Sequence, residues 1–118
     1  MALAHEIRET VLYPKRLAKR RFREEILSDW GHLCAYCSAE VGNTLDHVIP
    51  KFKNGSYDRH NLVACCPGCN RSKGSDDWLA WFKAQVFFCE KRARRIEQWL
   101  RGLDSRSWIP FEIAPSRD

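Results

Sequence analysis

Four cysteines in two pairs could bind one metal ion. Cys34 and Cys37 form one Cys-x2-Cys pair, Cys66 and Cys69 form another, and residues 38–65 separate the two pairs. A two-residue gap lets both thiolates of a turn face the same ion, and two such turns supply the four sulfur ligands of tetrahedral zinc. We therefore expect these four cysteines to bind a structural Zn²⁺.

Two other uses of these cysteines fit the pattern less well. An iron–sulfur cluster also takes four cysteines, but two paired turns in a small domain favour zinc. A redox-active Cys-x-x-Cys site needs one pair alone, and no βαβ pattern surrounds either pair. The two remaining cysteines, Cys65 and Cys89, are expected to be small buried apolar side chains.

Further polar residues lie between and beside the cysteine pairs. Asp46 and His47 are adjacent, Asn61 follows a polar loop, and Asn70 comes directly after the last cysteine. An imidazole can take a proton from water near neutral pH, and carboxylate and amide oxygens suit Mg²⁺ or Mn²⁺. In a short strand, Asp46 and His47 would point to opposite faces. They could flank one phosphate only if the strand, or its end, is twisted or bulged.

Taken together, these residues resemble the HNH nuclease motif. The shared pattern is a first cysteine pair, Asp-His-x-x-Pro, a loop with Asn-Leu, and a second cysteine pair followed by Asn and basic residues. The resemblance covers about residues 31–75. Residues 69–76 are similar to the HNH domain of RNA-guided CRISPR nucleases, and residues 78–100 resemble small stand-alone HNH proteins of cyanobacteria and their phages. The residues that carry the motif are Cys34, Cys37, Asp46, His47, Pro50, Asn61, Leu62, Cys66, Cys69, Asn70, Arg71 and Lys73.

The resemblance implies a role for each polar residue of the motif. His47 would be the general base that activates water, and Asp46 and Asn70 would hold a catalytic Mg²⁺ or Mn²⁺. Asn61 would brace the loop after His47 and orient the imidazole. Asn70 stands where many family members carry His, which should weaken binding of Ni²⁺, Co²⁺ or Zn²⁺ at the catalytic position. The products would be 5′-phosphate and 3′-hydroxyl ends.

An excess of positive charge predicts DNA as the partner. The chain has 20 Lys and Arg against 15 Asp and Glu, a formal net charge of +5. Arg71 and Lys73 adjoin the site and could contact phosphates at or near the scissile bond. The long-range DNA-binding candidates form a basic run before the first cysteine: Lys15, Arg16, Lys19, Arg20 and Arg23.

Length and composition limit the class of protein. A chain of 118 residues with 44% hydrophobic residues predicts one globular domain. No apolar run approaches the roughly 18–20 residues that cross a bilayer, and the first twenty residues lack an apolar export signal. We therefore expect a cytoplasmic protein without membrane contact, whose cysteines stay reduced and bind metal rather than form disulfides.

The residues of the site must be positioned by short strands and helices, so we expect an α+β fold. Its centre would be a small ββα-metal core, stabilised by the four-cysteine zinc site and flanked by N- and C-terminal helices. Two short strands are expected, at Thr44–Ile49 and Leu62–Ala64, with a helix starting at Pro67. Gly31 and Gly102 fit helix C-caps. The expected segments of one domain, 1–118, are a helix with a basic outer face (14–30), the zinc-bearing core (31–75), C-terminal helices (76–102) and an extended tail (103–118).

The sequence thus predicts a metal-dependent HNH endonuclease that hydrolyses DNA phosphodiester bonds. One alternative is a zinc-stabilised nucleic-acid-binding module without catalysis. Another is a nuclease subunit that is active only with a partner such as phage packaging machinery. Since one site cuts one strand, a double-strand cut needs either a homodimer or two successive cleavage events by a monomer. The sequence is compatible with both oligomeric states.

Overall fold

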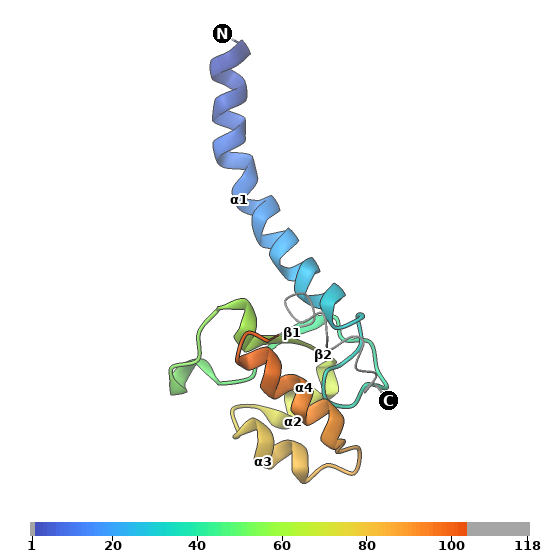
Figure 1. Cartoon of the computed structure of the whole chain (residues 1–118). Coiled ribbons are helices and arrows are strands. Elements are labelled where there is room, and N and C mark those ends of the chain that lie inside the picture. The colour runs from blue at the N-terminus through green and yellow to red at the C-terminus, as the bar shows by residue number, and fades with distance from the viewer. Residues whose placement is uncertain (1, 104–118) are drawn as a thin grey trace.

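A computed structural model describes the backbone of residues 2–103 and the side chains of residues 15–103. In the described part, a long helix is followed by two short strands and three short helices, and α1 projects from the body that the others form (Figure 1). The elements are α1 (Ala2–Asp29), β1 (Thr44–His47), η1 (Lys51–Lys53), η2 (Arg59–Asn61), β2 (Leu62–Cys65), α2 (Pro67–Lys73), α3 (Trp78–Lys83) and α4 (Glu90–Leu100).

The two strands form an antiparallel pair in which Thr44 lies opposite Cys65 and His47 lies opposite Leu62. The helix α2 follows β2 directly, so the predicted α+β class with a ββα order is confirmed. The first strand ends at His47 rather than at Ile49. Beyond His47, the backbone N–H of Ile49 donates to the Asn61 side chain at 2.9 Å instead of continuing the strand ladder.

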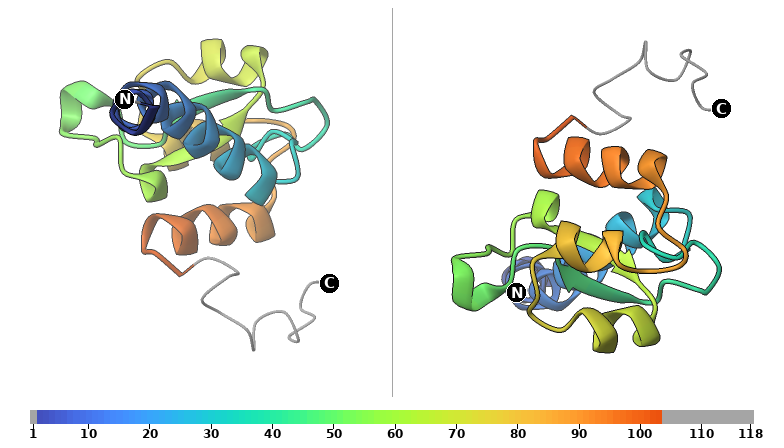
Figure 2. Two further views of the ribbon diagram at one scale, coloured as in Figure 1. Left: turned by 90° about the horizontal axis from the view of Figure 1, so that it is seen from above. Right: turned by 90° about the horizontal axis from the view of Figure 1, so that it is seen from below.

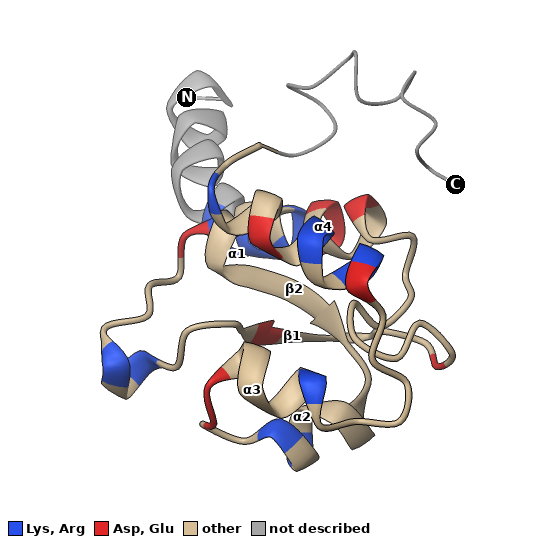
Figure 3. Ribbon diagram, turned by 60° about the horizontal axis from the view of Figure 1, so that its bottom comes forward, with Lys and Arg blue, Asp and Glu red and all other residues tan. Residues whose placement is uncertain are grey.

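Helices cover both faces of this small sheet. Figure 3 shows α4 on one side of the two strands and α2 and α3 on the other, and the two views of Figure 2 agree. The C-terminal part of α1 packs against both strands. The sheet therefore lies inside a shell of helices, and residues at the end of β1 have fixed surroundings.

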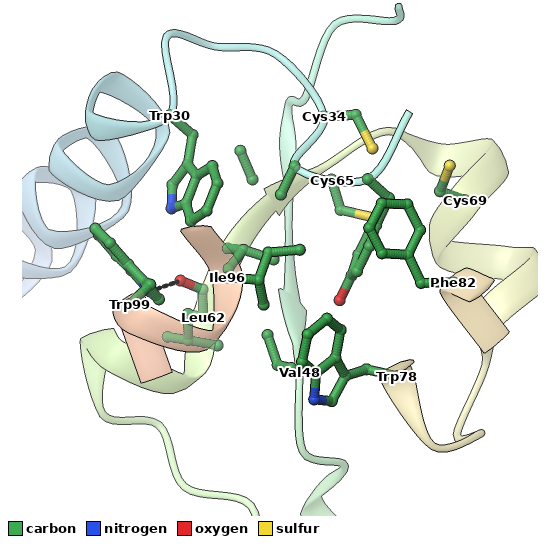
Figure 4. Close-up of a cluster of buried hydrophobic side chains, with 14 of the residues drawn as sticks. Trp30, Cys34, Val48, Leu62, Cys65, Cys69, Trp78, Phe82, Ile96 and Trp99 are labelled. Atoms are coloured by element: carbon green, nitrogen blue, oxygen red, sulfur yellow. Dashed lines mark hydrogen bonds between the residues drawn. The ribbon is translucent and has the colours of Figure 1, made fainter. Parts of the chain in front are cut away.

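The core between these layers is rich in tryptophan. Trp30, Trp78, Trp81 and Trp99 are all buried. The indole N–H of Trp99 donates to the backbone carbonyl of Leu62 at 2.9 Å, drawn in Figure 4. Since a buried indole N–H needs a partner, this bond ties α4 to the start of β2.

The helix α1 is longer than expected. A start at Pro14 is wrong, because α1 begins at Ala2 and runs through Pro14. The preceding segment contains Ala, Leu, Glu and Arg, which are strong helix formers. Their propensity extends the helix, although proline forfeits one backbone hydrogen bond.

Four of the basic residues of α1 do not lie on its outer face. Arg16, Lys19, Arg20 and Arg23 follow the spacing i, i+3, i+4, i+7, so they share one side of the helix. The same spacing continues to the core residues Ile26, Leu27 and Trp30. The stripe that faces the body is therefore apolar at the C-terminal end of α1 and basic further out.

The remaining expectations about helix ends agree with the structure. Gly31 and Gly102 follow α1 and α4 with φ values of 65° and 78°, a conformation that favours glycine at a helix C-cap. Residues 104–118 of the expected tail lie outside the described residues. No helix within the described part has the length and apolar character needed to cross a membrane.

Candidate functional site

The four paired cysteines converge on one point. The sulfur atoms of Cys34, Cys37, Cys66 and Cys69 all lie within 4.8 Å of one another, and those of Cys37 and Cys66 are 4.0 Å apart. Four sulfurs bound to zinc at about 2.3 Å in a tetrahedron are separated by about 3.8 Å. The cluster could therefore hold one metal ion with little rearrangement.

Both halves of the cluster are fixed by the backbone. The first turn is joined to β2 through the N–H of Ala35, which donates to the carbonyl of Ala64 at 2.9 Å. In the second turn, Cys66 is the N-cap of α2, and its sulfur accepts from the N–H of Cys69 at 3.3 Å. A metal held here would connect the segment after α1 to the start of α2.

The two unpaired cysteines differ from each other. Cys65 is fully buried beside the cluster, as expected. Cys89 is only half-buried because it lies at the N-cap of α4, so the expectation of a buried side chain is wrong there.

The strand β1 presents two different chemistries on its two faces. Thr44 and Asp46 point toward α2, where they contact Asn70 and Lys73 respectively. Leu45 and His47 point to the opposite face, where the His47 ring meets Tyr57. The register is regular along β1, so no bulge brings Asp46 and His47 to one face, and His47 is the last residue of the strand.

The carboxylate of Asp46 is held in the interior. Its side chain is 5% exposed, and it accepts a hydrogen bond of 2.8 Å from the hydroxyl of Tyr36. Burial raises the pKa of the Asp46 carboxyl, while the Lys73 ammonium and the Tyr36 hydroxyl oppose that change. Burial and the Asp46 charge also raise the pKa of Tyr36 well above its ordinary value, so the phenol stays protonated and donates.

Lys73 does not contact solvent, which contradicts its expected role at the DNA phosphates. Its side chain is 0% exposed, and Nζ lies 3.2 Å from Oδ2 of Asp46. The same ammonium donates to the backbone carbonyl of His47 at 3.2 Å. A buried ammonium needs a counter-charge, and the buried carboxylate supplies it, so Lys73 belongs to the interior.

Asn70 shares the α2 side of the sheet with Asp46. Its amide nitrogen donates to the hydroxyl of Thr44 at 3.2 Å, which leaves the amide oxygen for another partner. A carboxylate and an amide oxygen are the hard donors that Mg²⁺ and Mn²⁺ accept. The two oxygens of Asp46 offer about four lone-pair sites, so the carboxylate retains capacity beside Tyr36 and Lys73, and both side chains have donor atoms of the type that such an ion accepts.

His47 has a buried nitrogen without a partner. Its ring meets the ring of Tyr57 edge to face, with centroids 4.5 Å apart. Among the described residues, no hydrogen-bond partner reaches the buried Nε2 atom. Burial lowers the pKa of His47, although the charge of Asp46 opposes the shift. The neutral imidazole is therefore favoured near pH 7, and an unsatisfied acceptor or donor in the interior costs about 1–3 kcal/mol.

Asn61 is bonded at three points to the loop that follows His47. Its amide oxygen accepts from the N–H of Ile49 at 2.9 Å. Its amide nitrogen donates to the carbonyls of Ile49 at 3.0 Å and Ser56 at 2.8 Å. These three hydrogen bonds fix the backbone on both sides of the loop.

The expected DNA-binding residues fall into three groups. Arg71 is exposed on α2, and Lys15 is exposed on α1. Lys73 is buried, as described above. Four residues of α1 line a groove together with Tyr57 and residues of the sheet: Arg16, Lys19, Arg20 and Arg23.

Residues 34–76 match the family model described as HNH endonuclease. This segment belongs to the HNH endonuclease family. Both cysteine pairs, Asp46, His47, Asn61 and Asn70 lie inside the HNH segment, whereas α1 and α4 lie outside it.

Two curated relatives, both named CRISPR-associated endonuclease Cas9, are similar to the chain. The one from Corynebacterium diphtheriae is 32% identical over 81 residues, which are 63% of this chain and 8% of that protein. The one from Actinomyces naeslundii is 40% identical over 63 residues, 50% of this chain and 6% of that protein. The chain thus spans less than a tenth of the length of either relative. No solved structure shows significant similarity to the chain.

The structure adds two residues of the HNH segment that the motif did not indicate. Tyr36 lies between the first two cysteines and reaches Asp46, and Tyr57 lies against His47. Tyr36 could be noticed only as the aromatic residue inside a cysteine pair. Nothing in the spacing of Tyr57 distinguishes it from other loop residues.

Proposed function

We propose that this protein is a metal-dependent endonuclease that hydrolyses phosphodiester bonds of DNA. The observation that carries the proposal is His47, a neutral imidazole with an unpartnered buried nitrogen at the end of β1. Along the chain it directly follows Asp46, whose carboxylate is buried, and it precedes a braced loop within an HNH segment. The two similar proteins are named endonucleases, which supports the same chemistry.

In this proposal His47 is the general base. A neutral imidazole accepts the proton of a water molecule as that water attacks phosphorus, and positioned bases of this kind contribute roughly 10²–10⁴-fold to a rate. Asn61 is a positioning residue, because it fixes the loop on which the orientation of the imidazole depends. The side chains of His47 and Asp46 lie on opposite faces of β1, and His47 is the last residue of that strand. The scissile phosphate would therefore have to lie at the end of β1 to be within reach of both residues.

Asp46 and Asn70 would hold the catalytic Mg²⁺ or Mn²⁺. Such an ion supplies positive charge that stabilises the negative charge developing on phosphate and leaving oxygen. Tyr36 and Lys73 favour the ionised form of the Asp46 carboxylate against the effect of burial, and they hold it in one orientation. The backbone carbonyl of His47 accepts from the same Lys73 ammonium, so one buried lysine links the two halves of the site.

The four-cysteine cluster would hold Zn²⁺ with a purely structural role. Zinc prefers four thiolates in a tetrahedron, and a site with four protein ligands has no open position for chemistry. Asn70 directly follows the ligand Cys69, so zinc would also fix the start of the helix that carries Asn70.

The test is cleavage of supercoiled plasmid DNA with added Mg²⁺ or Mn²⁺. His47→Asn should lower the nicking rate by about 10²–10⁴-fold while the zinc content and circular dichroism spectrum stay unchanged. The matched control is His32→Asn, because His32 is exposed, has a φ of 57° that Asn tolerates, and its imidazole lies 3.7 Å from the carboxylate of Glu24 at the surface. Equal nicking rates for His47→Asn and the unaltered chain would rule out this mechanism.

A second candidate is a zinc-stabilised nucleic-acid-binding module without catalysis. The observation in its favour is the Lys73 ammonium, which already neutralises Asp46. Titration with Mn²⁺, followed by electron paramagnetic resonance, separates the candidates. The nuclease proposal expects Mn²⁺ binding that Asp46→Asn weakens, whereas the binding module expects no such site. Nicking that appears only after addition of a partner protein would favour a partner-dependent subunit.

A further inference from the structure

A groove beside the site is formed by α1 and the sheet. It has a volume of about 870 Å³. One wall is the exposed half of α1, and the floor carries Leu45, Leu62 and Tyr57. Leu45 lies two residues before His47 on β1, so the groove opens on the same face of the sheet as the proposed base.

The wall of this groove is positively charged. Arg16, Lys19, Arg20 and Arg23 line it and occupy the face of α1 that turns toward the body. Arg21 is also exposed on α1, but it lies outside that stripe and does not line the groove. Four cations on one wall suit the phosphates of a nucleic acid, which supply sequence-independent attraction.

The floor of the groove is apolar and aromatic. Leu45 and Leu62 lie at its base, and Phe22 borders it from α1. Tyr57 is 63% exposed. Its ring meets the His47 ring edge to face, and the Lys51 ammonium lies over the Tyr57 ring, 5.0 Å from the centroid. A ring exposed in this way can stack on a nucleic-acid base, and such stacking is tolerant of sequence because every base has a π-face.

The combination of a basic wall and an apolar floor favours one form of DNA. In a duplex, the base faces are stacked on each other and only the phosphates and base edges are accessible. A duplex would meet the cations of α1 but would leave the apolar floor in water. In an unpaired strand the phosphates and the base faces are both accessible, so it can contact wall and floor together.

We propose that the groove between α1 and the sheet binds an unpaired DNA strand and directs it over Tyr57 to His47. This inference rests on the proposed nuclease function and names its substrate class. Arg16, Lys19, Arg20 and Arg23 hold the phosphates, and Tyr57 stacks on the base nearest the cleavage position.

The test is binding of a labelled single-stranded oligonucleotide and of its duplex, measured by fluorescence anisotropy. The full chain is used with its zinc retained and no Mg²⁺ or Mn²⁺ added, so that cleavage does not interfere. The single strand should bind at least about tenfold more tightly than the duplex, as expected for one or more stacked bases. Duplex binding that equals or exceeds single-strand binding would overturn the proposal.

Two pairs of variants locate the binding surface. Tyr57→Ala should weaken single-strand binding by about tenfold, and Tyr57→Trp should restore it. The matched aromatic control is Phe52→Ala, because Phe52 is 70% exposed in the same loop but does not line the groove. Arg20→Ala should weaken binding, whereas Arg21→Ala, its neighbour on α1, should have a smaller effect. Equal effects within either pair would contradict the assignment of the groove.

Failure of this inference can be distinguished from failure of the nuclease function. A chain that nicks plasmid in a His47-dependent manner, but binds duplex as tightly as single strand, lacks the proposed groove function. A chain that binds single strands through Tyr57 and Arg20, but does not cleave DNA, has the groove function without the nuclease.

Discussion

At the scale of single residues, the interior of the HNH segment contains a buried ion pair between Lys73 and Asp46. The Lys73 ammonium and the Asp46 carboxylate are both removed from water, and Tyr36 donates to the same carboxylate. Taking two charges into an interior is costly, and removing one partner leaves the other uncompensated. The pair therefore limits which substitutions this site tolerates.

Lys73→Met should lower the free energy of unfolding by about 3–5 kcal/mol, because it leaves the Asp46 carboxylate buried without its counter-charge. The measurement is urea denaturation followed by tryptophan fluorescence. Arg71→Met on the same helix is the matched control, since Arg71 is exposed, and its effect should stay within about 0.5 kcal/mol. If both variants unfold at the same urea concentration, the buried ion pair does not contribute as described.

Residue chemistry was predictable from the sequence where it depends on local spacing. The spacing of the two cysteine pairs predicts one cluster, and the four sulfur atoms lie within 4.8 Å of one another. The role of Lys73 was not predictable, because its partner Asp46 is 27 positions away and a lysine after a cysteine pair looks like a surface residue. Whether it turns inward depends on how α2 packs on β1, which spacing along the chain does not specify.

At the scale of elements, the cysteine cluster joins two segments that secondary structure alone holds weakly. A two-stranded antiparallel pair is marginally stable by itself, and α2 has 7 residues, fewer than an isolated helix needs. Zinc would connect the turn after α1 with the N-terminus of α2. Binding energy of a structural zinc is then also folding energy.

Cys69→Ser should abolish stoichiometric zinc binding and lower the midpoint of thermal unfolding, because one of four thiolate ligands is lost. Native mass spectrometry reports the zinc content, and circular dichroism reports the unfolding. Cys89→Ser is the matched control, since Cys89 lies outside the cluster and serine suits its N-cap position. Retention of zinc and of the unfolding midpoint by Cys69→Ser would argue against a structural metal.

The orientation of α1 shows what the periodicity of one element leaves undetermined. The sequence predicted that the basic residues of this helix lie on its outer face. In the structure the basic residues continue the line of Ile26, Leu27 and Trp30. The direction in which the outer half of α1 faces follows from its attachment to the sheet, which is a tertiary contact.

At the scale of the whole molecule, the shape is elongated, with principal dimensions of 60 × 35 × 26 Å. Figure 1 shows that α1 accounts for the long dimension. The net charge of +5 is therefore unevenly distributed, because several of the basic residues lie on one side of the projecting helix α1. Long-range attraction of DNA would be directed toward the groove.

Binding of a single strand should weaken with salt in proportion to the phosphates contacted. If the four groove cations each neutralise one phosphate, the slope of log K against log salt concentration is about −3, and Arg20→Ala should make it less steep by about 0.7. Anisotropy titrations over a series of NaCl concentrations measure both values. A slope near zero, or one that Arg20→Ala leaves unchanged, would show that the basic residues of the groove do not contact the DNA phosphates.

The stripe on α1 also limits what the protein can recognise. Arg16 and Arg23 are seven positions apart, which corresponds to about 10 Å along a helix. A contact of that length touches few nucleotides, and neither stacking nor phosphate binding reads base identity. Under the proposed nuclease and groove functions, the protein would select DNA by whether it is paired rather than by its sequence. Any sequence would then become a substrate where pairing is lost, at a displaced strand or a frayed end, so cells would control cleavage by controlling where and when unpaired DNA occurs.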